Sequence, residues 1–403
     1  MSHPPFEPFY TLLLLLTGAA YLVALEIVRA GLKRLEDRNA SMGWKNPAAG
    51  GHLPFVSVII PCRDEARHIG HCLEDLSRQD YPGDQFEVIV VDDRSDDGSG
   101  EIARAYRSCI PNLQVLRLDT CPPGISPKKN ALRRGMNLAG GDVFITTDAD
   151  CRLNSGWITS LVSEMEPHVG LVTGLTVFDR GTNEPFWQRM QQLDYLSHSF
   201  FAAGAIRCGW AFNCNGSNLA LRRRAFEDVG GYDGFGQVVT GDDTLLMQRL
   251  QRIGRWTIRF CARPGNLVHS WPEETLREVM NQRLRWGSGG LSYSSPALSL
   301  ALITFVFFFG LLASPFMWIG GMIAPYWILL LLGKWMQEAR VLRQGFRAFH
   351  LKADWLAFMA LEVIHIPAIL TFSLGGHLLG FRWKGQRFRR KSSSVPTREV
   401  LET

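Results

Sequence analysis

Apolar residues gather at the two ends of this chain, and shorter apolar runs alternate with polar segments between them. The long runs cover residues 8–27, 297–335 and 355–380. A transmembrane helix needs about 20 predominantly apolar residues, so each run is long enough to cross a bilayer. The pattern therefore predicts membrane segments on both sides of a soluble middle region.

The first apolar run is predicted to be a retained anchor within residues 1–34. Residues 1–7 contain no Lys or Arg, whereas a secretory signal peptide, the alternative, carries positive charge ahead of its apolar core. Arg29, Lys33 and Arg34 follow the run. By the positive-inside rule they place the segment after the anchor in the cytosol.

The C-terminal membrane region, residues 297–380, is predicted to hold a helical hairpin followed by a further apolar helix. Residues 297–335 are too long for one crossing and break near the Ser-Pro or Gly-Gly pairs within residues 314–321. In the last run, Glu362 and His365 lie three residues apart and share one helical face. We interpret them as a polar pair facing neighbouring helices, with a functional site as the alternative.

Basic residues between and after these helices predict two further cytosolic segments, a loop and a tail. The tail, residues 381–403, begins "FRWKGQRFRRK". One anchor, a hairpin and one more crossing would leave this tail outside, which contradicts its charge. The number of spans therefore stays open at three or four in a predicted multi-pass protein of the plasma (inner) membrane. The loop carries Arg340, Arg343, Arg347 and Lys352.

The middle region, residues 54–270, is predicted to alternate between strands and helices. The β-branched runs "FVSVIIP", "FEVIVVDD" and "VFITTDAD" are typical of short buried strands. Such alternation indicates an α/β fold with a mostly parallel central sheet and helices on both faces. The predicted strands cover residues 55–61, 86–93 and 143–150, and the predicted helices cover residues 64–79, 98–109 and 128–140.

Carboxylates follow each of these three strands, where ligands of open α/β sheets bind. Asp is costly inside a core, so acids from three strand ends need a counterion or a donor-rich ligand. A nucleoside diphosphate with Mg²⁺ or Mn²⁺ supplies both, because these ions prefer carboxylate and phosphate oxygens. The acids are Asp64, Glu65, Asp92, Asp93, Asp148 and Asp150.

The amino-acid composition and charge argue against several kinds of partner, cofactor and cross-link. The 403 residues carry a net charge of +5, and the basic excess lies near the apolar ends, which favours an anionic membrane surface over a nucleic acid. The eight cysteines are scattered singly without metal-type spacing, which argues against a disulfide framework or structural zinc. The first predicted strand is followed by "PCRDEARH", so a glycine-rich dinucleotide loop is excluded there.

Six segments together resemble the sequence blocks of family-2 glycosyltransferases, in the order of that family. They are "VSVIIPCRDEARHIGHCLEDLSRQDYP", "EVIVVDDRSDDGSGEIA", "KKNALRRGMNLAGGDVFITTDAD", "NGSNLALRRRAF", "GDDTLLMQRLQRIG" and "NQRLRWGSGG". The last contains the QxxRW element of membrane-bound members. The resemblance covers roughly residues 54–290, and it implies a GT-A type fold that binds a nucleotide-sugar.

The resemblance also implies roles for residues on the donor side. Asp92 and Asp93 match the acids that hold uracil and ribose. Lys128 or Lys129 matches a lysine near the donor, and a solvated helix start is the alternative for both. The DxD pair, Asp148 and Asp150, matches the acids that contact ribose and the metal–diphosphate, with Asp150 as the direct metal ligand.

On the acceptor side, the resemblance implies that Asp243 is the general base. Asp242 stands where the family usually has Glu, which leaves its contact to the acceptor open. In the QxxRW element, Gln282 would contact the donor, Arg285 the leaving diphosphate and Trp286 a sugar or lipid. This element lies in residues 271–296, which are also predicted to form an amphipathic segment on the membrane surface.

The expected function is therefore an inverting, metal-dependent transfer of a sugar, expected to come from a UDP-sugar, to a membrane lipid at the cytosolic face. A processive polysaccharide synthase, with a growing glycan as acceptor, is the first alternative, although the few predicted spans favour the lipid. A catalytically inactive scaffolding homologue is the second alternative. His269 is interpreted as a loop or core histidine, with an additional metal ligand as the alternative.

Overall fold

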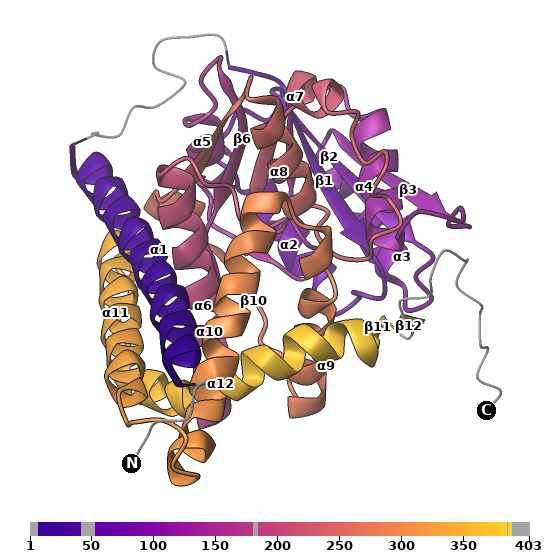
Figure 1. Cartoon of the computed structure of the whole chain (residues 1–403). Helices are drawn as coiled ribbons and strands as arrows, with labels where there is room; N and C mark the ends of the chain where they lie inside the picture. The colour runs from indigo at the N-terminus through magenta and orange to yellow at the C-terminus, as the bar shows by residue number, and fades with distance from the viewer. Residues whose placement is uncertain (1–6, 42–52, 180–183, 385, 389–403) are drawn as a thin grey trace, which may run out of the picture.

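The computed structural model describes residues 7–41, 53–179, 184–384 and 386–388. Its centre is a seven-stranded sheet with the order β3-β2-β1-β4-β8-β6-β9 (Figure 1). All neighbouring strands pair in parallel except for β8, which is antiparallel to both β4 and β6. The predicted α/β fold with a mostly parallel sheet is confirmed.

The strands of this sheet form where β-branched and aromatic residues are consecutive, as expected for strands buried on both faces. The first two strands match their predicted ranges closely, whereas the third ends at Thr146, before its two acids. The seven strands are β1 (Val56–Cys62), β2 (Phe86–Asp93), β3 (Leu113–Leu118), β4 (Val143–Thr146), β6 (Val169–Gly174), β8 (Leu219–Arg222) and β9 (Thr257–Cys261). A smaller sheet, ordered β5-β10-β7, joins β5 (Arg152–Leu153), β7 (Thr176–Phe178) and β10 (Val268–Ser270).

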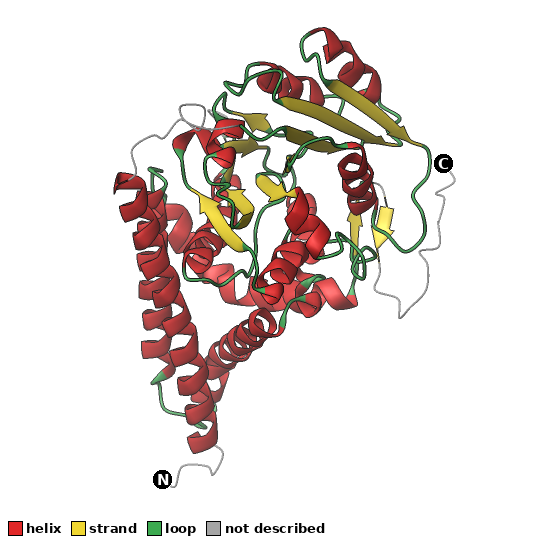
Figure 2. Cartoon of the chain, turned by 90° about the horizontal axis from the view of Figure 1, so that it is seen from above, coloured by secondary structure: helices red, strands yellow, loops and turns green. Residues whose placement is uncertain are grey.

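Helices cover both faces of the sheet, as Figure 2 shows. The predicted helix 64–79 begins later than expected, at Ile69, because Asp64 adopts a left-handed backbone with φ 53°. The helices of this part are α2 (Ile69–Ser77), α3 (Ser99–Ala105), α4 (Pro127–Leu138), α5 (Trp157–Val162), α6 (Phe186–Arg207), α7 (Arg223–Asp228), α8 (Thr244–Ile253) and α9 (Leu276–Gly287).

Four long helices pack beside the sheet domain. They are α1 (Glu7–Ser41), α10 (Ser295–Ile319), α11 (Trp327–Ala348) and α12 (Trp355–Leu378). By length and composition, α1, α10 and α12 are each able to cross a membrane. The break between α10 and α11 lies at the Gly-Gly pair, within the range predicted for a hairpin, but α11 runs on to Ala348 and is not among the described helices able to cross a membrane. The predicted basic loop is wrong at Arg340, Arg343 and Arg347, because these residues lie within α11, whose polar face packs against α1.

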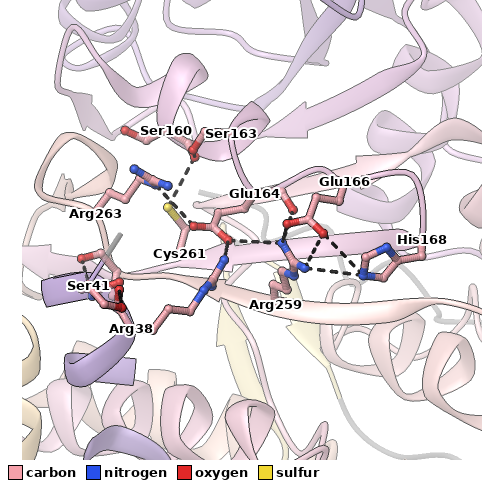
Figure 3. A network of polar contacts seen from close by, with 12 residues as sticks. Arg38, Ser41, Ser160, Ser163, Glu164, Glu166, His168, Arg259, Cys261 and Arg263 are labelled. Atoms are coloured by element: carbon pink, nitrogen blue, oxygen red, sulfur yellow. Dashed lines mark hydrogen bonds and ion pairs between the residues drawn. The ribbon is translucent and has the colours of Figure 1, made fainter. Parts of the chain in front are cut away.

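An ion-pair network fastens α1 to the sheet domain (Figure 3). The Arg38 guanidinium lies 2.7 Å from the buried Glu164 carboxylate, which also faces Arg263 at 3.3 Å and Arg259 at 3.6 Å. Arg259 in turn contacts Glu166 at 2.6 Å. The network fixes the end of α1 against the edge strand β9, so the anchor helix and the sheet form one packed body.

Both ends of α12 contact the sheet domain. At its start, Arg189 of α6 donates two hydrogen bonds of 2.8 Å to Asp354. Near its end, Gly375 and Gly376 pack against Leu284 of α9 so closely that a Cβ at Gly376 would lie 2.5 Å from a carbonyl oxygen. The hairpin β11 (Phe381–Trp383) and β12 (Gln386–Phe388) follows and also contacts α9.

Candidate active site

A cavity of about 1710 Å³ opens at the carboxyl ends of β1, β2 and β4 and continues between α6, α10 and α12. Asp93 follows β2, the DxD pair follows β4, and α9 supplies the QxxRW residues. The predicted site residues that line the cavity are Asp93, Lys128, Asp148, Asp150, Asp242, Asp243, Gln282, Arg285 and Trp286. The fold therefore brings together side chains that are separated by almost 200 positions.

A lysine joins two acids at the centre of this site. The Lys128 Nζ lies 2.6 Å from Asp148 Oδ1 and 3.7 Å from Asp242 Oδ2. Burial opposes the charge of Lys128, but the two acids outweigh it and raise its pKa. Burial also opposes the charge of Asp242, and Lys128 leads the charges that lower the pKa of that carboxyl. Lys128 thus stays protonated and links the DxD loop to the loop before α8.

Asp243 is held rigidly at the N-terminus of α8. Its Oδ1 accepts a hydrogen bond of 2.6 Å from the Thr244 amide, and its Oδ2 accepts one of 2.6 Å from the Gly216 amide. Burial, followed by the neighbouring charge of Asp242, raises the pKa of Asp243 to about 6. A fixed carboxylate whose pKa lies near neutrality suits a general base.

Asp150 lies deeper in the same cavity. Burial, then the charges of Asp148 and Glu65, raise its pKa to about 6. Glu65, just after β1, receives a 2.6 Å contact from Lys384 of the C-terminal hairpin. Three acids, Asp148, Asp150 and Glu65, converge here with two nearby lysines, Lys128 and Lys384, and the remaining carboxylate charge suits a hard divalent cation.

The two acids at the end of β2 differ in position. Asp93 lines the cavity and accepts two hydrogen bonds of 2.9 Å from Arg94. Asp92 is completely buried outside the cavity lining, where it accepts hydrogen bonds from the Ser95 amide and Arg117. The prediction that Asp92 binds the donor is therefore wrong, because its oxygens close the turn after the strand.

Of the two lysines predicted to lie near the donor, Lys128 lines the cavity and Lys129 does not. The Lys129 ammonium is fully buried and donates to the carbonyl oxygens of Phe235, Val238 and Thr240. Burial lowers its pKa to about 8, with Asp242 and Asp243 opposing the shift. Lys129 thus holds the backbone before Asp242 in place from behind the cavity.

The helix α9, which carries the QxxRW residues, lines the cavity. It begins with a capping box between Thr275 and Glu278. Gln282 donates a 2.7 Å hydrogen bond to Glu273. Arg285 reaches the acids: burial lowers its pKa, and Asp148 leads the charges that oppose this shift.

Trp286 faces α6 rather than the acids. Its ring lies 6.0 Å from the Tyr195 ring and 6.2 Å from the His198 ring, and the Arg283 guanidinium stacks at 4.3 Å on its face. Arg283 also pairs at 2.5 Å with Asp194. The QxxRW helix is therefore joined to α6 by ring contacts and an ion pair.

Sequence reasoning missed two contributors to the site and correctly set one candidate aside. Glu65 was noted as a strand-end acid without a role, and Lys384 was counted as a tail charge, although both line the cavity. A basic residue just after the last apolar helix indicated a position at the membrane interface. The sequence pattern did not indicate its partner Glu65, which lies 319 residues away. His269 lies on β10, outside the cavity lining, as the interpretation of a core histidine expects.

The arrangement defines the class of protein. The mannosyltransferase PcManGT from Pyrobaculum calidifontis, solved with GDP-Man and Mn²⁺, superposes with a TM-score of 0.55 over 91% of this chain and 99% of that chain, at 19% identity. The shared architecture is the GT-A fold of glycosyltransferases.

Residues 57–230 match the family Glycosyl transferase family 2, which identifies a glycosyltransferase domain in this part of the chain. Glycosyltransferase AglE of Haloferax volcanii is 29% identical over 244 residues, which cover 59% of this chain and 73% of that protein. Beta-monoglucosyldiacylglycerol synthase of Synechocystis sp. is 29% identical over 279 residues, 68% of this chain and 55% of that protein. This chain thus spans about half the length of the synthase.

Proposed function

We propose that this protein transfers a sugar from a nucleotide-sugar, a UDP-sugar by expectation, to a membrane lipid, with inversion at the anomeric carbon. The observation that carries the proposal is the fixed Asp243 carboxylate, which shares one cavity with the DxD acids and with an apolar region between membrane-type helices. The cavity combines the residues that would bind the donor with an apolar surface that a lipid acceptor would contact.

The donor would occupy the end of the cavity that lies at the carboxyl ends of the strands. Asp93 offers carboxylate oxygens to base N–H or ribose hydroxyl groups, and Gln282 is an amide at the same end. Asp148 and Asp150 would hold Mg²⁺ or Mn²⁺, which neutralises diphosphate charge when bound. Arg285 supplies a guanidinium whose planar fork matches phosphate oxygens.

Transfer would proceed as one displacement. Asp243 accepts the proton of the acceptor hydroxyl while the hydroxyl oxygen forms a bond to the anomeric carbon, and the bond from that carbon to the diphosphate oxygen breaks. General-base assistance of this kind is typically worth about 10²–10⁴-fold in rate. Arg285 stabilises the negative charge that develops on the departing diphosphate. Asp242, one residue away, would contact the acceptor.

A lipid acceptor is supported by the wall of the cavity. Ala301 and Phe305 of α10 and Phe358, Ile369 and Phe372 of α12 contribute apolar surface to it. The similar protein from Synechocystis sp. is named a glucosyldiacylglycerol synthase, which agrees with a lipid substrate. Trp286 lines the same cavity, where it would stack on the acceptor. Arg29, Lys33 and Arg34, which follow the apolar run within α1, support a cytosolic location of the site, beside the nucleotide pool.

The test is incubation of the purified full chain with labelled UDP-sugars, Mg²⁺ or Mn²⁺ and a membrane lipid extract, followed by separation of the products by size. We expect one sugar on a lipid, and no product with Asp243→Asn. A ladder of long products would replace the lipid function with a processive synthase. Absence of both transfer and UDP release would overturn the proposal in favour of a scaffold.

A further inference from the structure

Helix α6 presents a row of polar side chains to the cavity. Gln191, Asp194, Tyr195 and His198 line it at the spacing i, i+3, i+4 and i+7, which places them on one helical face. Asp194 pairs with Arg283, Tyr195 bonds to Asn215, and His198 packs on Trp286. Each of these three has a partner that explains its presence.

Gln191 differs from its neighbours in this row. It is 4% exposed, and neither its Oε1 nor its Nε2 has a hydrogen-bond partner among the described residues. A buried amide without a partner carries a desolvation cost that no hydrogen bond offsets. Because the side chain lines the cavity, a ligand in the cavity is able to supply the missing hydrogen bonds.

The surroundings of Gln191 limit the ligand. The amide lies one turn before Asp194, on the row that faces Trp286, and the adjoining wall from α12 is apolar at Phe358 and Leu361. Further along α12, the carboxylate of Glu362 is already paired with Lys334 at 2.6 Å. Gln191 is therefore the unsatisfied polar group beside an apolar channel, close to the end where transfer is proposed.

We propose that Gln191 is a specificity residue for the acceptor, recognising an amide or hydroxyl group on a lipid next to the hydroxyl that receives the sugar. This inference rests on the proposed function. Its chemistry follows from the side chain, since a primary amide both donates and accepts and is satisfied by a group that does the same. An N-acylated amino alcohol lipid offers such groups, whereas the ester oxygens of a diacylglycerol only accept.

Binding gives the first test, independent of turnover. The full chain in detergent micelles is heated with ceramide or with a diacylglycerol of matched acyl chains. We expect ceramide to raise the unfolding temperature more than diacylglycerol does. In Gln191→Met, which keeps the length of the side chain without its polar atoms, the two lipids should give equal shifts. Equal shifts for the wild-type protein would overturn the proposal without any variant.

Transfer gives the second test. We expect kcat/KM for ceramide to exceed that for diacylglycerol by at least about tenfold, because a site built to bond an N–H or O–H group rejects the analogue that lacks it. Gln191→Met should reduce the ratio to about one with unchanged UDP affinity. The matched control is Gln344→Leu, which removes a buried amide bonded to Glu36 outside the cavity lining and should keep the ratio.

The outcomes separate the two proposals. Equal use of both lipids by the wild-type protein and by Gln191→Met would remove the role of Gln191 and leave the glycosyltransferase function standing. A ceramide-dependent thermal shift that Gln191→Met abolishes, together with no transfer to any lipid, would support the subsite and remove the proposed function.

Discussion

Two clusters in this protein combine several acids with a lysine. Only the first contains carboxylates that this lysine does not contact. In the sheet domain, Lys128 serves Asp148 at 2.6 Å and Asp242 at 3.7 Å, while Asp150 and Asp243 keep pKa values of about 6. In the helical bundle, Lys334 lies 2.8 Å from Glu338, 2.6 Å from Glu362 and 3.2 Å from His365 Nδ1.

The bundle cluster shows why close acids do not by themselves make a metal site. The ligand atoms of Glu338, Glu362 and His365 lie within 4.8 Å of one another, a spacing that would suit a cation. The Lys334 ammonium already supplies the positive charge, and Tyr21 donates a 2.5 Å hydrogen bond to Glu338. The cluster joins α1, α11 and α12, whereas the surplus of acids in the sheet domain is left for a ligand.

The largest expected effect follows from removing the base. Asp243→Asn keeps the size of the side chain but cannot accept the acceptor proton, so we expect kcat to fall by about 10²–10⁴-fold with UDP affinity retained. Steady-state transfer and calorimetric titration with UDP measure the two quantities. Asp119→Asn, at a carboxylate that is 89% exposed, is the control. Loss of UDP binding in Asp243→Asn would assign this carboxylate to the donor instead.

The bundle cluster should respond in stability rather than in chemistry. Lys334→Met leaves two buried acids without their shared cation, and breaking a buried ion pair typically costs about 3–5 kcal/mol. Thermal unfolding in detergent measures the loss, and Lys33→Met on the exposed side of α1 is the matched control. Adding Glu338→Gln and Glu362→Gln should recover much of the stability. An unchanged unfolding temperature in Lys334→Met would contradict the role of the cluster in stabilising the packing of α1, α11 and α12.

The dependence on pH should come from the sheet domain. The raised pKa of Asp243, about 6, means that the folded protein binds this proton more tightly than the unfolded chain does. Its burial therefore favours the folded state at low pH and loses that contribution as the pH rises through about 6. A base must be deprotonated, so we expect kcat/KM to fall about tenfold per pH unit below about 6. A flat profile between pH 5 and 7, roughly the range in which this group titrates, would exclude Asp243 as the base.

The smallest expected effect concerns Lys384. Its charge lowers the pKa of Asp150, so Lys384→Gln should raise that pKa further. We expect the acidic limb of the metal-dependent activity to move upward by about a few tenths of a pH unit, because a partly exposed pair interacts weakly. Titration of activity with Mn²⁺ at several pH values measures the shift. Arg382→Gln, two residues earlier in β11, is the comparison, and a downward shift in Lys384→Gln would contradict the assignment.

Local patterns were sufficient to predict three strands of the central sheet, β1, β2 and β4, and most of the candidate residues that share the cavity. β2 begins and ends where its apolar run does, and Asp93, Asp148, Asp150 and Asp243 meet as the order of the strands requires. The pattern did not distinguish which of two adjacent residues of the same type lines the cavity. Asp92 and Lys129 face away from the cavity because strand and helix geometry turns neighbouring side chains to different sides.

Tertiary contacts account for the remaining differences. The charges at Arg340, Arg343 and Arg347 indicated a loop, but these residues lie on the exposed side of helix α11, whereas Gln344 on its buried side bonds to Glu36 of α1. The partner of Glu362 was equally unreadable, because Lys334 lies on a different helix. The interpretation of Glu362 and His365 as a pair facing neighbouring helices is supported by that contact.

The contact between the C-terminal hairpin and α9 limits the number of membrane passages in the chain between them. The Arg382 amide bonds to Asn281, and Lys384 reaches Glu65, so the chain before α10 and the chain after α12 lie on one side of any bilayer. The number of complete passages between them must therefore be even. Among the described helices between these two contacts, α10 and α12 have the length and composition to cross, and two passages satisfy an even count.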